Sequence, residues 1–183
     1  MRRRTLLAAG ATVASGLLPR KPRAAGPGEG LPDLRQLTVK PGGAPLPEFR
    51  FKLPDGTVQR VADYAGKGLV LNLWATWCVP CVAEMPALDA LAVAVADGGV
   101  VVLPLSSDRG GVPVVERFYR ERGIAHLPVL LDPAGSGARI LGARGIPTTL
   151  LIDKGGLERG RMEGAADWAS AEAIKLVRTL MAS

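Results

Sequence analysis

The sequence is poor in cysteine, in histidine and in aromatic residues. Two cysteines among 183 residues exclude a small domain held by several disulfides and a zinc module with four cysteine ligands. A single histidine, His126, excludes a metal site or a catalytic pair built from several histidines. Hydrophobic residues make up 48% of the chain and charged residues 22%, which excludes a disordered or fibrous protein. We expect one globular domain with appended segments.

Acidic residues are absent from the first 25 positions, and this absence explains the net charge of +6. That segment holds six of the 23 basic residues and none of the 17 acidic ones, so the rest of the chain is formally neutral. The basic excess is therefore confined to the N-terminus. The body has no basic stripe of the kind that binds nucleic acid, and we expect no nucleic-acid partner.

Residues 1–25 have the layout of a secretory signal peptide. A basic start precedes the apolar run TLLAAGATVASGLL, and the small pair Ala24-Ala25 suits a cleavage site. The run has 14 residues, fewer than the roughly 20 that a helix needs to cross a bilayer. The segment RRTLL also resembles a twin-arginine export signal. An uncleaved leader would instead tether the protein to the membrane; in both cases we expect the body outside the cytoplasm, in the periplasm of a Gram-negative cell.

The chain after the leader is interpreted as a linker followed by an α/β domain. Residues 26–44 are rich in glycine and proline, which is typical of a linker, with at most a short extended piece at Leu34–Val39. Residues 45–183 alternate apolar runs with helical periodicity, which predicts a mixed central sheet flanked by helices. The expected strands are 49–51, 57–61, 68–75, 100–106, 127–131, 148–153 and 157–163, of which the first two and the last two form β-hairpins. The expected helices are 79–96 with a kink at Pro86, 112–121, 136–141, and a last one that Asp167 caps and that ends near 181.

The chemistry centres on Cys78-Val79-Pro80-Cys81, at a predicted junction between strand and helix. The unpaired N–H groups and the dipole of a helix N-terminus favour a thiolate at Cys78, and the thiolate is the form that attacks a disulfide. Cys78 is therefore the predicted attacking residue, and Cys81, one turn deeper, is the resolving residue. A purely structural disulfide is disfavoured, because its stabilisation grows with loop length and this loop encloses two residues. Half of a metal site would need further ligands, and only His126 and acidic residues are available.

Two segments resemble a known family. Residues 71–81 (LNLWATWCVPC) resemble the thioredoxin superfamily active site, and residues 82–88 (VAEMPAL) resemble the TlpA-like branch of exported thiol-disulfide oxidoreductases, which includes the cytochrome c maturation thioredoxins. Residues 145–153 (GIPTTLLID) resemble the cis-proline segment of that family. The resemblance covers residues 45–181. It implies a thioredoxin fold with an N-terminal β-hairpin and a βα insertion between the second strand and the next helix, which residues 100–131 are long enough to hold.

The resemblance also implies roles for residues outside the cysteine motif. A cis bond between Ile146 and Pro147 would leave the backbone of Ile146 free to pair with an extended substrate beside Cys78. Glu84 follows Cys81 by three residues and is expected near the cysteine pair. A carboxyl group buried there would have a raised pKa and would exchange a proton with Cys81.

Further residues near the motif are assigned by their type and position. Asn72 stands on the strand where thioredoxin itself carries a buried aspartate; since an amide cannot take a proton, that role would pass to the glutamate or to water. Trp77 and Val79 are expected to contact substrate, whereas Trp74 is expected in the core. Pro80 would lie in the first helical turn, where its missing N–H costs nothing, and would help to tune the redox potential.

We expect an exported protein-disulfide reductase that acts on a specific client disulfide, in apocytochrome c or in a copper-site assembly factor. Electrons would come from a membrane donor that delivers thiols; we expect a monomer with no resident metal and no cofactor beyond the Cys78–Cys81 disulfide. One alternative is a copper metallochaperone that uses Cys78, Cys81 and His126. Another is a peroxidase of the related peroxiredoxin fold, but the threonine and arginine that would activate peroxide around a lone thiolate are not found at Cys78.

Overall fold

The computed structural model describes residues 26–181, so the predicted leader at residues 1–25 lies outside the described part. The strands are β1 (Thr38–Pro45), β2 (Arg50–Lys52), β3 (Val58–Arg60), β4 (Gly68–Trp74), β5 (Val100–Ser106), β6 (Leu130–Leu131), β7 (Thr148–Ile152) and β8 (Leu157–Glu163). The α-helices are α1 (Val79–Val95), α2 (Gly111–Arg122), α3 (Ser136–Ile140) and α4 (Ala171–Met181). Short 3-10 turns are η1 (Leu34–Gln36), η2 (Val61–Tyr64) and η3 (Ala96–Gly98).

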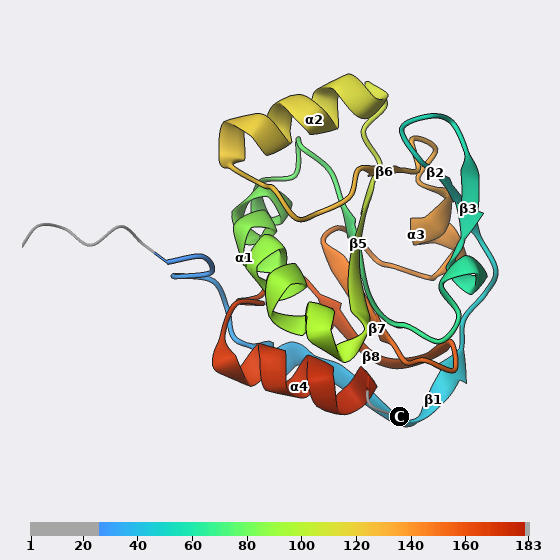
Figure 1. Cartoon of the computed structure of the whole chain (residues 1–183), viewed down its shortest axis with the longest axis vertical. Coiled ribbons are helices and arrows are strands. Elements are labelled where there is room, and N and C mark those ends of the chain that lie inside the picture. Colours follow the sequence, from blue (N-terminus) through green and yellow to red (C-terminus); the bar gives the residue numbers. More distant parts are fainter. Residues whose placement is uncertain (1–25, 182–183) are drawn as a thin grey trace, which may run out of the picture.

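One mixed sheet joins these strands in the order β1-β8-β7-β4-β5-β6-β2-β3 (Figure 1). Strands β4, β5 and β6 run parallel, and the other neighbouring pairs run antiparallel. β4 pairs with β5 from Gly68, opposite Val100, to Trp74, opposite Ser106, and its other edge pairs with β7. Every residue of β4 is buried, which explains its continuous apolar sequence. The predicted mixed α/β architecture is confirmed.

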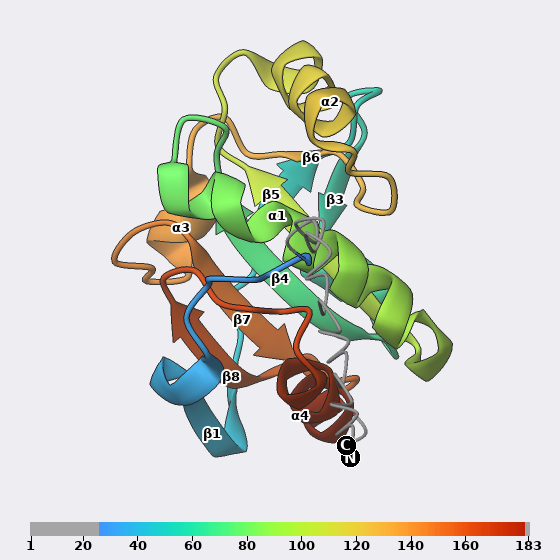
Figure 2. The same cartoon turned by 90° about the vertical axis from the view of Figure 1, so that its left-hand side faces the viewer.

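The sheet is covered on both faces. Figure 1 shows α1 and α4 on one side of the central strands and α3 on the other, and Figure 2 looks onto the side of α1 and α4. Side chains of β4 alternate between two apolar cores: Val70 and Trp74 join α1, α2 and α4, whereas Leu71 and Leu73 face the β2 side and α3. Packing on both faces therefore fixes the end of β4, and with it the position of residues 75–78, which connect β4 to α1.

The predicted linker at residues 26–44 is wrong, because much of this segment belongs to the folded domain. β1 (Thr38–Pro45) pairs with β8 at one edge of the sheet, and the side chain of Leu34 is buried in the core beside α1 and α4. An edge strand tolerates proline and glycine better than a central strand does. Gly43, with a φ of 68°, lies in the irregular stretch between the two paired parts of β1. The same composition that is typical of a linker thus also suits a bulged edge strand.

The remaining elements follow the predicted order. Both predicted hairpins are present as β2/β3 and β7/β8, and α2 with β6 forms the predicted βα insertion between β5 and α3. Helix α1 continues through Pro86 without a break. β6 has only two residues where five were predicted, because Pro128 has no N–H for a strand ladder.

The N-terminus of α4 differs from the prediction. The carboxylate of Asp167 accepts the N–H of Ala169 in the preceding turn and does not cap the helix. The hydroxyl of Ser170 accepts the N–H of Ala173 instead, at 3.1 Å. Both residue types cap helices well, so the sequence did not distinguish them.

One helical stretch within residues 26–181, Val79–Gly98, is long and apolar enough to span a membrane by length and composition. It consists of α1 and η3. Met85, Leu88 and Leu91 on α1 are completely buried in the core of the domain. The apolar character of this helix is thus accounted for by packing against the sheet.

Candidate active site

Cys78 and Cys81 form a disulfide where β4 gives way to α1. Their Cα atoms are 5.2 Å apart. Cys78 is the N-cap residue of α1, and its Sγ accepts the N–H of Cys81 at 3.3 Å. Cys78 retains 6% of its surface exposed and Cys81 none. Cys78 is therefore the more exposed of the two cysteines, and once it is reduced the helix N-terminus favours its thiolate.

The turn before the disulfide is fixed at both ends. The N–H of Cys78 donates to the carbonyl of Ala75, which closes a turn over Thr76 and Trp77. Pro80 lies in the first turn of α1, where its missing N–H costs no hydrogen bond within the helix. Cys78 is thus placed at the start of α1 by the turn from Ala75 and by the first helical turn that contains Pro80.

The peptide bond between Ile146 and Pro147 is cis, as the family resemblance implied. Pro147 directly precedes β7, and the carbonyl oxygen of Ile146 lies 3.6 Å from Sγ of Cys78. The half-buried side chain of Ile146 packs against both apolar cores. Two motifs that are 68 residues apart therefore meet at the sulfur that a substrate would approach.

Two apolar side chains around the disulfide face solvent. Trp77 is 68% exposed and Val79 is 80% exposed, which places both where a partner can contact them. Trp74 is completely buried and stacks on Tyr119 with an interplanar angle of 13°. This contrast confirms that Trp74 belongs to the core. An exposed tryptophan beside a reactive sulfur is typical of a contact surface.

Glu84 is completely buried beneath the disulfide, on the face of α1 that meets the sheet. Its Oε1 accepts a hydrogen bond from Nδ2 of Asn72 at 2.9 Å. Its Oε2 accepts two hydrogen bonds, from the backbone N–H of Ala166 at 3.1 Å and from Nε1–H of Trp168 at 3.0 Å. Burial raises the pKa of Glu84 to about 7, and these three hydrogen bonds limit the rise. A carboxyl group that titrates near neutral pH is suited to proton exchange.

Asn72 links Glu84 to β7. Its Nδ2 also donates to Oγ1 of Thr149 at 2.9 Å, while its Oδ1 has no hydrogen-bond partner among residues 26–181. A protonated Glu84 carries a hydroxyl that needs an acceptor. A half-turn of the Asn72 amide would offer Oδ1 to that hydroxyl, so the amide can serve both protonation states of the acid.

Asp108, which the sequence analysis missed, holds the turn before the disulfide. Its side chain is buried at the end of β5 and accepts the N–H of Thr76 at 2.9 Å, the Thr76 hydroxyl at 2.7 Å and the Ser106 hydroxyl at 2.8 Å. The sequence feature that could have pointed to it is the polar pair Ser107-Asp108, which directly follows the buried strand β5. That strand is parallel to β4, so both carboxyl ends meet at one edge of the sheet.

His126 is not brought to the cysteines. Its Nδ1 lies 2.9 Å from Oδ2 of Asp89, and Oδ1 of the same aspartate accepts the backbone N–H of His126. Within the described part of the chain, no group of three histidine, cysteine, aspartate or glutamate residues is placed to hold a metal ion. The copper site of the alternative interpretation, which needs Cys78, Cys81 and His126 together, is therefore not assembled.

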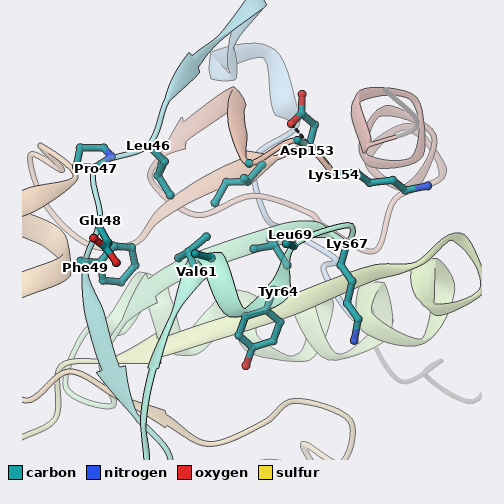
Figure 3. Close-up of a pocket in the computed structure, with 15 residues that line it drawn as sticks. Leu46, Pro47, Glu48, Phe49, Val61, Tyr64, Lys67, Leu69, Asp153 and Lys154 are labelled. Atoms are coloured by element: carbon teal, nitrogen blue, oxygen red, sulfur yellow. Dashed lines mark hydrogen bonds between the residues drawn. The ribbon is translucent and has the colours of Figure 1, made fainter.

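A separate pocket of about 300 Å³ lies at the opposite end of β4 (Figure 3). Leu69, Val61 and Tyr64 line it, and the side chains of Lys67 and Lys154 extend away from it. Five residues of extended strand separate Leu69 from the end of β4, a distance of about 17 Å. This pocket takes no part in chemistry at the disulfide.

Comparison with known proteins agrees with this geometry. A family model described as AhpC/TSA family matches residues 43–158. The thiol-disulfide oxidoreductase ResA of Geobacillus thermodenitrificans (strain NG80-2) is 35% identical over 114 residues, which cover 62% of this chain and 64% of that protein. The chain spans 64 to 65% of the length of the first curated relatives that it matches.

Solved structures show the same architecture. The exposed lipoprotein thioredoxin of Streptococcus pneumoniae strain TIGR4 is 32% identical, with a TM-score of 0.57 over 72% of this chain and 98% of that one. A DsbF homologue from Corynebacterium diphtheriae is 25% identical, with a TM-score of 0.63 over 79% of this chain and 93% of that one. The predicted thioredoxin-like fold is confirmed.

Proposed function

The chain belongs to the AhpC/TSA family, and we propose that it is an exported thiol-disulfide oxidoreductase that reduces a disulfide in a client protein. The observation that carries this proposal is the Cys78–Cys81 disulfide at the N-terminus of α1, in which Cys78 keeps 6% of its surface exposed and Cys81 none. Relatives named thiol-disulfide oxidoreductase support the same reaction class.

The reaction begins with both cysteines reduced. The Cys78 thiolate attacks one sulfur of the client disulfide, forms a mixed disulfide and releases the other client sulfur as a thiolate. Cys81 then loses its proton and attacks Cys78. The second client sulfur leaves as a thiolate, and the Cys78–Cys81 disulfide forms again. Two electrons pass from the protein to the client, and a donor must reduce the pair before the next cycle.

Glu84 is proposed to take the proton of Cys81 in the second step. Cys81 is completely buried, so water has little access to its thiol. Glu84 lies nearly one turn further along the same helix, and its pKa of about 7 lets it accept a proton near neutral pH. Three donors face its carboxylate in the disulfide form and hold the side chain in place there.

Residues around Cys78 are proposed to bind the client. Trp77 and Val79 offer exposed apolar surface, and the fixed backbone of Ile146 offers a hydrogen-bonding edge beside the sulfur. An extended client strand that pairs there would bring its disulfide in line with Cys78. Pro147 has no N–H to donate, and its carbonyl accepts the N–H of Gly164 at 2.9 Å, which holds the start of β7 next to the end of β8.

Export and partners complete the proposal. The basic and apolar layout of residues 1–25 supports export, and one structural neighbour is described as an exposed lipoprotein. Outside the cytoplasm the client would be a protein of cytochrome assembly, either apocytochrome c or a copper-site assembly factor. A thiol-delivering membrane protein would then supply the electrons.

The proposal is tested by reduction of insulin. Protein that has been reduced and freed of reductant is mixed with insulin, and free thiols appearing on insulin are counted. We expect close to two insulin thiols per protein molecule in a single turnover, and none with Cys78→Ser. A reduced wild-type protein that leaves insulin and all other protein disulfides intact would refute the proposal.

A further inference from the structure

Two hollows lie beside Trp77 and Val79, the exposed residues next to Cys78, on the side of α2. One, of about 460 Å³, is lined by residues that include Val79 and Arg117; the other, of about 580 Å³, is lined by residues that include Trp77 and Arg109. Both are lined by Val114, so they adjoin each other. Figure 1 shows α2 beside the N-terminal end of α1. We call these two hollows together the arginine groove.

Three arginines and two acidic residues line the groove, so its lining carries a net positive charge. Arg109, Arg117 and Arg122 line it, all three are exposed, and none forms an ion pair within the described residues. Glu121 is the one exposed acid among its lining residues. Asp108 also lines it, but its carboxylate is buried and already accepts three hydrogen bonds from Thr76 and Ser106.

Residues 26–181 hold twelve arginines, and six of them pair with carboxylates: Arg35, Arg60, Arg144, Arg159, Arg161 and Arg178. Of the six without an ion pair among these residues, three line the groove; the other three, Arg50, Arg120 and Arg139, do not. The helix dipole accounts for a cation such as Arg122 in the last turn of α2, but it does not account for Arg109, which precedes the helix. Arg122 also lies over the ring of Phe118, 5.8 Å from its centroid, which holds the guanidinium against the groove wall.

We propose that the arginine groove docks an acidic segment of the client next to the disulfide that Cys78 attacks. Guanidinium groups bind carboxylates through paired hydrogen bonds, and charges around an apolar centre speed encounter and select partners. Trp77 and Val79 supply that apolar centre between the two hollows. This inference rests on the proposed reductase function and adds the chemistry of the client to it.

The test uses three disulfide-bonded peptides that differ only in flanking residues: aspartate, serine or lysine. Rates of reduction by the reduced protein are measured at low and high salt, with hydroxyethyl disulfide as an uncharged small substrate. We expect the acidic peptide to react about tenfold faster than the basic one at low salt, and the ratio to fall at high salt. The triple variant Arg109→Gln, Arg117→Gln, Arg122→Gln should bring the ratio near one and leave the small-substrate rate unchanged.

A second triple variant, Arg50→Gln, Lys67→Gln, Lys175→Gln, removes the same charge at exposed positions outside the groove and should keep the preference. Equal losses in the two variants would mean a general charge effect and would overturn the proposal. Equal rates for the three wild-type peptides would overturn it as well. If only the groove variant loses binding to phosphatidylglycerol vesicles while the peptide ratio is unaffected, the groove faces a membrane and the proposal fails. Absence of any reduction, hydroxyethyl disulfide included, would instead refute the reductase function.

Discussion

The indole N–H of Trp168 donates a 3.0 Å hydrogen bond to the carboxylate of Glu84. The two residues are 84 positions apart, and the contact joins the helix of the disulfide to the segment before α4. Both side chains are completely buried. An acid in such a place is costly to ionise, so the surrounding donors determine the pH at which it can work.

Replacement of Glu84 by glutamine should remove a pH-dependent loss of stability. Because the folded-state pKa of Glu84 is raised from 4.5 to about 7, the neutral acid is favoured below pH 4.5 and that advantage is lost as the pH rises through 7. The stability of Glu84→Gln relative to the wild type should therefore increase by roughly 3 kcal/mol between pH 4.5 and pH 8. Urea unfolding of the oxidised proteins measures this difference, and a constant difference across that range would contradict the raised pKa.

Replacement of Trp168 by phenylalanine should raise the pKa of Glu84 further, because the carboxylate loses one of its three donors. We also expect a loss of stability of about 1–3 kcal/mol. Carbon NMR of the Glu84 carboxyl group follows the titration directly. Trp77→Phe is the matched control, since Trp77 is exposed and should leave the titration in place. A Trp168→Phe protein whose Glu84 titrates as in the wild type would show that the indole does not stabilise the anion.

Replacement of Asn72 by aspartate should place a second carboxyl group within hydrogen-bonding distance of Glu84. Two carboxyl groups so close share a proton, because both cannot ionise together at low cost. The variant should be as stable as the wild type in acid and should lose stability more steeply above pH 7. Thermal unfolding between pH 4 and pH 9 tests this, and parallel curves for the two proteins would argue against direct coupling of residues 72 and 84.

Replacement of Asp108 by asparagine should slow the attack of Cys78. The variant keeps the size of the side chain but removes the charged acceptor for the Thr76 N–H, so the turn that presents Cys78 is less firmly held. We expect the rate with hydroxyethyl disulfide to fall about tenfold, which corresponds to about 1.4 kcal/mol in the barrier.

Ser106→Ala serves as the control for Asp108, because it removes a partner of the aspartate that does not belong to the turn. It should lower stability with little effect on the rate. If Asp108→Asn lowers stability but the rate constant and the pH profile of Cys78 stay unchanged, the aspartate has only a structural role.

The sequence predicted the parts of the site that depend on local order. Cys78, Pro80 and Cys81 follow from the motif and its place at a strand-to-helix junction, and the cis bond before Pro147 follows from a family resemblance. Glu84 was predicted near the pair because it lies one turn along the same helix. Helical spacing fixes such neighbours without any knowledge of the fold.

Contacts between distant segments were not predictable in the same way. Asp108 reaches Thr76 through the register of β4 against β5, and Trp168 reaches Glu84 through the packing of the segment before α4. Neither register nor packing is encoded in a local pattern. β1 was missed for a different reason: its glycine and proline content is also typical of a linker, and only its pairing with β8 reveals the edge strand.

Trapping of the mixed disulfide tests the account most directly. Reduced Cys81→Ser is mixed with a disulfide-bonded client peptide, and the adduct is mapped by mass spectrometry. The account predicts a stable adduct through Cys78, resolved by a thiol reductant, and little or no adduct with Cys78→Ser. If Cys78→Ser forms the stable adduct through Cys81 and Cys81→Ser forms none, the accessible sulfur at the helix start is not the attacking one and the account is contradicted.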